Sequence, residues 1–123
     1  MNDLNLQNAE YFGTENQMIQ FCEELAELTQ AASKWLRLYR HDPTLRKTED
    51  EIMEDLIEEL ADVSIMTDQI KHLLEIPEKK IREKRSNKIF KTAADIHNEK
   101  WRHKWRREQT HEQDNERNTQ GKL

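Results

Sequence analysis

The stretch Thr14–Arg40, TENQMIQFCEELAELTQAASKWLRLYR, has the apolar spacing of a long amphipathic helix. With about 100° of turn per residue, its apolar positions gather into one arc. The members of that arc are Met18, Phe21, Cys22, Leu25, Leu28, Ala32 and Leu36. Thr14 is the expected N-cap, with Gln17 in the capping-box position. The run His41-Asp42-Pro43 should end the helix near Arg40.

A second helix is expected from Thr48, which forms another capping box with Glu51, to about Glu75. Its apolar stripe runs through Ile52, Met53, Leu56, Leu60, Val63, Ile70 and Leu74. Pro77 suits the first turn of a third helix that continues, straight or kinked, through Trp105. The short connection between the first two helices makes them antiparallel neighbours.

The composition favours helices throughout the chain. Two Gly and two Pro among 123 residues leave little material for the turns of an all-β fold. The sequence therefore predicts an all-α fold, an antiparallel bundle of about three to four helices. Because two long helices leave apolar surface bare, we expect at least a homodimer. The folded domain should span residues 1–108, and the polar segment 109–123 should form a flexible tail.

Hydropathy, cysteine content and charge limit the cellular compartment and the partners that we expect for the protein. No apolar run approaches the roughly 18–20 residues of a membrane span, so we expect no membrane partner. Cys22 is the single cysteine, which fits a reducing cytoplasm. The net charge of −5 hides an asymmetry, since residues 1–77 carry 6 Lys and Arg against 17 Asp and Glu, and residues 78–123 carry 14 against 8. One half could hold cations and the other phosphates, although solvated helix faces explain the same charges.

Acidic residues lie beside both apolar stripes. On the first helix Glu24 and Glu27 fall at one edge of the arc, about 60° apart, whereas Glu23 turns toward water. On the second helix Glu59 lies within the margin of the stripe, with Asp62 beside it. An unpaired carboxylate in such a place is costly or stays protonated. Either motif alone would be explained by a solvated bundle rim, but the matching placement of both favours a site for a hard cation such as Mg²⁺.

These residues resemble a known family, the MazG-like all-α nucleoside triphosphate pyrophosphohydrolases, which include dimeric dUTPases and dCTP pyrophosphatases. The family signature is E-E-x-x-E on one helix and E-x-x-D on the next, matched here by Glu23–Glu27 and Glu59–Asp62. The resemblance covers roughly residues 12–90. It implies a helical bundle completed by dimers or tetramers. It also implies Mg²⁺-dependent hydrolysis of a (deoxy)nucleoside triphosphate to the monophosphate and pyrophosphate, with Mn²⁺ as the alternative cofactor.

The resemblance also implies roles for individual residues. Glu24, Glu27, Glu59 and Asp62 would ligate the metal, and Glu23 would orient a water or a second ion. The basic third helix of the family is matched only loosely, and the residues here that would bind phosphate are Lys84, Arg85, Asn87 and Lys88. For each of these four taken singly, a plain solvated face is the favoured explanation. The gap between the two acidic motifs is longer than in many members of the family.

Aromatic residues offer further candidates. Trp35 follows the strip of Glu24 and Glu27 and lies about 12 Å beyond Glu27 along the axis, a distance that suits a stacked nucleobase. A core or interface tryptophan explains it equally well. Trp101 and Trp105 stand one turn apart among basic residues, and such residues can stack on nucleic acid or dock on a bundle. The alternative function is therefore a non-catalytic helical module whose basic C-terminal arm binds nucleic acid or a protein partner.

Overall fold

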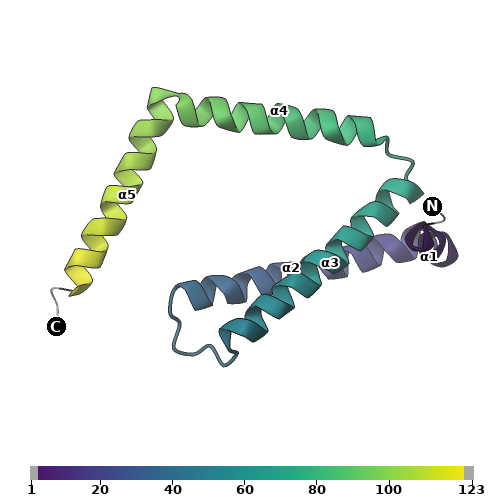
Figure 1. Ribbon diagram of the computed structural model, residues 1–123, viewed down its shortest axis with the longest axis horizontal. Coiled ribbons are helices and arrows are strands. Elements are labelled where there is room, and N and C mark those ends of the chain that lie inside the picture. The colour runs from purple at the N-terminus through teal and green to yellow at the C-terminus, as the bar shows by residue number, and fades with distance from the viewer. Residues whose placement is uncertain (1–2, 121–123) are drawn as a thin grey trace. The chain divides into compact units, whose positions relative to one another are not determined.

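The computed structural model describes residues 3–120, of which 99–101 and 120 are described by their backbone alone. The described residues form five helices and no strand (Figure 1). The helices are α1 (Leu4–Phe12), α2 (Thr14–Tyr39), α3 (Glu49–Leu73), α4 (Glu78–His97) and α5 (Glu99–Gln120). The all-α prediction is confirmed. The chain divides into two units, Met1–Glu78 and Lys79–Leu123, each of which has its own internal contacts.

The first unit is an antiparallel hairpin of α2 and α3 with the short α1 packed against both. Its buried apolar side chains come from all three helices and are Ala9, Ala31, Ile52, Met66 and Ile70. On α2 the side chains facing α3 include the buried Gln17 and Ala31 and the partly buried Phe21, Glu24 and Leu28. The expected apolar arc therefore meets α3 only at its edge, and the seam includes a carboxylate.

Two helix starts were predicted from capping boxes, and one of them is found. Thr48 caps α3, because its hydroxyl accepts a hydrogen bond from the Glu51 amide at 3.2 Å. The prediction for Thr14 was wrong, since Thr14 is already helical and Gly13 precedes it as the cap with φ of +86°. Glycine takes this left-handed conformation without steric cost, so the chain turns there without a side-chain cap.

A chain of amide groups joins the three helices of the hairpin unit. Gln17 donates from Nε2 to Gln69 Oε1 at 2.6 Å, and both side chains are buried. Gln69 in turn donates from Nε2 to Asn5 Oδ1 at 2.7 Å, and Asn5 donates to the Ile65 carbonyl at 3.1 Å. Because Gln17 lies near the start of α2 and Gln69 near the end of α3, these bonds fix the register of the antiparallel pair.

The second unit consists of α4 and α5. None of the residues of α4, all of which are described, is buried, and the described side chains of α5 are exposed as well. The expected third helix ends at His97 and restarts after Asn98. Helical backbone continues to Gln120, past the expected end near Glu108, while the flexibility of the tail stays a prediction. Over the described residues, every helix is too short or too polar to span a membrane.

Candidate metal centre

Three of the predicted acidic residues meet across the α2–α3 seam. One carboxylate oxygen from each of Glu24, Glu27 and Glu59 lies within 4.8 Å of the others. The antiparallel register explains this meeting, because the bond between Gln17 and Gln69 places the middle of α2 beside the middle of α3. We refer to Glu24, Glu27 and Glu59 as the carboxylate trio.

Two oxygens of the carboxylate trio are buried without a hydrogen-bond partner, namely Glu24 Oε2 and Glu59 Oε2. The other oxygen of Glu24, Oε1, accepts a hydrogen bond from Gln20 Nε2 at 2.8 Å. Gln20 thereby holds the Glu24 carboxylate in one orientation. Buried polar atoms in folded proteins are nearly always paired with protein, water or an ion. The two orphaned oxygens are therefore candidate ligand atoms for a cation.

The electrostatics of the trio point the same way. The negative charge of Glu24 and partial burial raise the pKa of Glu27 above its ordinary value. Burial raises the pKa of Glu59, and the charges of Glu27, Asp62 and Glu24 add to the effect. Like charges this close favour protonation unless a positive ion balances them. A bound cation would therefore favour the ionised forms of Glu27 and Glu59.

The spacing of the trio suits a small divalent ion. Mg²⁺ holds oxygen ligands at about 2.0–2.1 Å, so two ligand oxygens on one ion lie at most about 4.2 Å apart. The trio oxygens all lie within 4.8 Å of one another, which is close to that limit. An all-oxygen donor set is also the kind that Mg²⁺ and Mn²⁺ prefer.

The remaining predicted acids are placed differently. Asp62 is partly buried beside the trio, and its charge contributes to the raised pKa of both Glu59 and Glu27. Its oxygens do not belong to the group of atoms within 4.8 Å. Glu23 is exposed on the outside of α2, as its helical position predicts. The structure therefore brings together three of the four predicted ligands, with the fourth adjacent.

The predicted base-stacking residue has a partner on one of its faces. Trp35 is 37% exposed, and its ring stacks on that of Tyr39 with centroids 5.4 Å apart and planes 14° from parallel. Only the opposite face of the Trp35 ring is left for a further planar group. Whether that group is a nucleobase stays a prediction.

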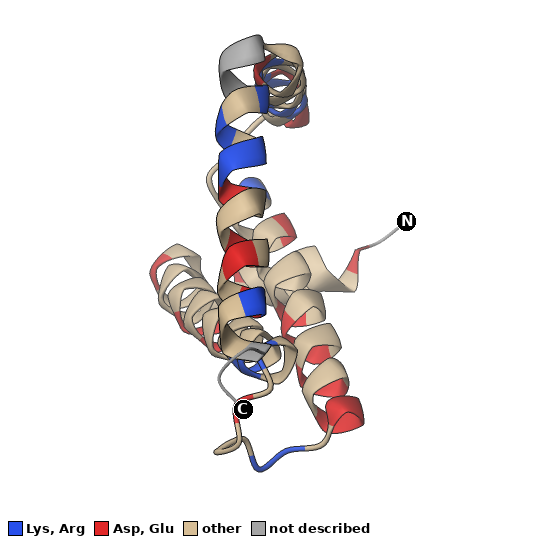
Figure 2. Cartoon of the chain, turned by 90° about the vertical axis from the view of Figure 1, so that its left-hand side faces the viewer, with Lys and Arg blue, Asp and Glu red and all other residues tan. Residues whose placement is uncertain are grey.

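The four predicted phosphate-binding residues lie on α4. Lys84, Arg85, Asn87 and Lys88 are all exposed there, and they belong to the second unit, whereas the carboxylate trio belongs to the first. Lys and Arg (blue in Figure 2) recur along α4 and α5, and Asp and Glu (red) along α2 and α3. The role of the four residues in substrate binding stays a prediction.

Sequence reasoning missed two residues of this region. Gln20 orients Glu24, and Tyr39 stacks on Trp35. Both lie four residues from their partners along α2, and residues so spaced are neighbours on a helix surface. A search for polar and aromatic pairs at this spacing would have found them.

No family model, no curated protein and no solved structure matches the chain.

Proposed function

We propose that this protein is a Mg²⁺-dependent nucleoside triphosphate pyrophosphohydrolase. The observation that carries the proposal is the carboxylate trio with its two orphaned buried oxygens, because it assembles from the two acidic motifs whose spacing resembles that of the MazG-like enzymes. Uncompensated acids at a helix seam oppose folding. A bound cation would offset this cost.

A Mg²⁺ ion at the carboxylate trio would contribute to the reaction in two ways. Bound Mg²⁺ would neutralise triphosphate oxygens and make a water a stronger nucleophile. Glu24, Glu27 and Glu59 would hold the ion, and Asp62 would add negative charge beside them. Gln20 keeps one Glu24 oxygen engaged and leaves the other for the ion. Glu23, exposed next to Glu24, would orient a water.

The reaction would break the bond between the α-phosphorus and the oxygen that bridges to the β-phosphorus. A water oxygen forms a bond to the α-phosphorus, and pyrophosphate leaves with the bonding electrons. The proton from water passes to a carboxylate of the site, and spacing does not fix which one. The nucleobase would stack on one face of the Trp35 ring, while Tyr39 stacks on the other face and holds the ring in place.

We further propose that two copies associate through an apolar face of the α2–α3 hairpin. Two rows of exposed apolar side chains support this, Leu25 and Leu36 on α2 and Met53, Ile57 and Leu60 on α3. Helical turning places both rows on the same side of the antiparallel pair, away from Glu27. An apolar face of this kind marks an interaction surface.

A panel of triphosphates, incubated with and without Mg²⁺, tests the proposed activity. Both products should be measured, because monophosphate with pyrophosphate distinguishes this reaction from loss of the γ-phosphate. Glu59→Gln should lower the rate at least about 100-fold, since even residues that only support metal ligands contribute 10- to 100-fold. Glu58→Gln is the matched control, because Glu58 is the exposed neighbour of Glu59. Equal rates in the two variants would reject this site.

A further inference from the structure

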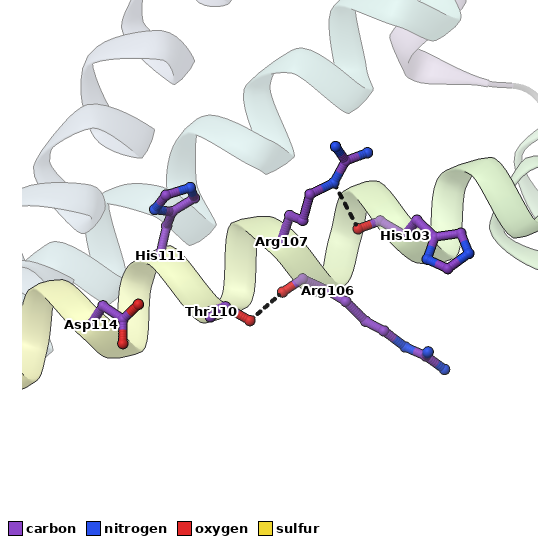
Figure 3. Close-up of a pocket in the computed structure, with 6 residues that line it drawn as sticks. All are labelled: His103, Arg106, Arg107, Thr110, His111 and Asp114. Atoms are coloured by element: carbon purple, nitrogen blue, oxygen red, sulfur yellow. Dashed lines mark hydrogen bonds between the residues drawn. The ribbon is translucent and has the colours of Figure 1, made fainter.

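The carboxylate trio differs from the surface hollow on α5 in how firmly its polar atoms are held. The hollow is lined by exposed side chains of one helix (Figure 3). Its hydrogen bonds join side chains to backbone carbonyls of the preceding turn. Such a surface does not select one ligand. The trio joins two helices and has buried oxygens, so a single hydrogen bond there can decide which ion fits.

The two carboxylate oxygens of Glu24 have different surroundings. Oε1 accepts a hydrogen bond from Gln20 Nε2 at 2.8 Å, whereas Oε2 is buried without a hydrogen-bond partner. Gln20 lies one turn before Glu24 on α2 and is half-buried, and side chains four residues apart are neighbours on a helix. The hydrogen bond therefore draws Oε1 back along α2 and leaves Oε2 as the open oxygen of Glu24.

Mg²⁺ and Ca²⁺ differ in what they need from a carboxylate. Mg²⁺ requires near-ideal octahedral geometry at about 2.0–2.1 Å and keeps several waters. Ca²⁺ takes about 6–8 oxygens at about 2.3–2.6 Å and accepts carboxylates through one or both oxygens. Three carboxylates that each give one oxygen leave half of an octahedron for water or phosphate. The same three oxygens supply half or less of the ligands that Ca²⁺ takes.

From these contacts we infer that Gln20 is a positioning residue that makes the carboxylate trio prefer Mg²⁺ or Mn²⁺ over Ca²⁺. The inference rests on the metal site of the proposed function. Ca²⁺ can gain a second oxygen from Glu24 only if Oε1 turns away from Gln20, which leaves the half-buried Gln20 amide without its partner. Mg²⁺ needs Oε2 alone, so the hydrogen bond to Gln20 stays intact. That bond also fixes Oε2 in place, which favours the ion with the stricter geometry.

Isothermal titration calorimetry of the full chain with MgCl₂, MnCl₂ and CaCl₂, without nucleotide, tests the inference. The unchanged chain should bind Mg²⁺ and Mn²⁺ more tightly than Ca²⁺. Gln20→Met keeps a side chain of similar length and removes the donor. It should weaken Mg²⁺ binding about 10- to 100-fold, as is usual for residues that support metal ligands, and weaken Ca²⁺ binding much less. The matched control is Gln30→Met at an exposed position of α2, which should leave both dissociation constants unchanged.

The ratio of the Ca²⁺ and Mg²⁺ dissociation constants decides the outcome. Equal weakening of both ions in Gln20→Met would overturn the inference, because a general loosening of the site does not distinguish the ions. Equal affinities in the unchanged chain would overturn it as well. Circular dichroism and thermal melts in chelator check the fold of each variant. If Gln20→Met does not fold, Gln20→Ala removes the same donor and introduces the strongest helix former.

The same titrations separate this inference from the proposed function. A chain that prefers Mg²⁺ through Gln20 but releases no pyrophosphate from any triphosphate would reject the proposed activity and support the role of Gln20. A chain that releases pyrophosphate, with the same ion preference in Gln20→Met, would reject the role of Gln20 alone. Absence of binding to all three ions would overturn both.

Discussion

The raised pKa of Glu59 makes the stability of the fold depend on pH. Burial and the charges of Glu27, Asp62 and Glu24 raise its pKa. The stability contributed by the protonated form is fully present below the ordinary value of 4.5 and is lost as the pH rises through the raised value. At neutral pH the ionised carboxylate therefore lowers the free energy of unfolding, and a bound cation would offset the repulsion.

Glu59→Gln should consequently raise the melting temperature of the metal-free protein at pH 7, because the amide keeps the shape and removes the charge. The increase should shrink toward zero as the pH falls below the ordinary pKa. Added Mg²⁺ should stabilise the unchanged chain and have little effect on the variant. Thermal melts in chelator and in Mg²⁺ measure both effects. A variant less stable than the parent at every pH would show that the carboxylate is a structural partner instead.

Gln69 links two other helices, so its removal should affect the whole hairpin. Gln69→Leu leaves Gln17 Nε2 and Asn5 Oδ1 without their partner. Leaving a buried polar group unpaired costs about 1–3 kcal/mol. Urea denaturation should show this destabilisation, and Gln30→Leu on the exposed side of α2 serves as the control. An effect as large in the control would contradict the role given to Gln69.

At the scale of the helices, periodicity predicted the ranges of α2 and α3 well but not the side of α2 that meets α3. An apolar stripe wider than about 100° fits more than one partner. The seam of α2 includes Gln17 and Glu24, which a count of apolar residues places at the edge. The buried bond to Gln69, 52 residues away, is a tertiary contact that local sequence does not encode.

The two capping predictions give a matched pair of variants. Thr48→Ala should cost about 1 kcal/mol, because the Thr48 hydroxyl accepts from the Glu51 amide. Thr14→Ala should change the free energy of unfolding by much less, since α2 begins after Gly13 without a side-chain cap. Chemical denaturation of the two variants compares them directly. The reverse order would show that the caps are assigned to the wrong residues.

At the scale of the whole molecule, the helical class could be predicted because it follows from composition and local spacing. The meeting of Glu24 and Glu27 with Glu59 also required the antiparallel pairing of α2 and α3, which was expected from their short connection. Two features of the structure could not be predicted from the sequence. The division after Glu78 depends on how few tertiary contacts the later helices make. That the carboxylate trio excludes the oxygens of Asp62 depends on side-chain geometry within the seam.

The proposed association of two copies should be sensitive to one charge on the apolar face. Ile57→Lys would place an ammonium group in the interface, and an unpaired buried ion costs several kcal/mol. The dissociation constant should rise by about 100-fold or more, where about 1.4 kcal/mol corresponds to tenfold. Light scattering across a dilution series measures it. Ile19→Lys, exposed but outside the two rows, should leave assembly unchanged, and equal behaviour of the two variants would place the contact elsewhere.

The hydrogen bond between the side-chain amides of Gln17 and Gln69 has a consequence for the connection at residues 40–48. This hydrogen bond and the packing around it set the register of α3 against α2. The register therefore does not depend on the length of the loop. Doubling a flexible loop costs only about 0.6 kcal/mol. Insertions between the two acidic motifs can therefore accumulate while opposing glutamates stay aligned. The loop of the hairpin can lengthen without a change in how the middle parts of α2 and α3 are aligned.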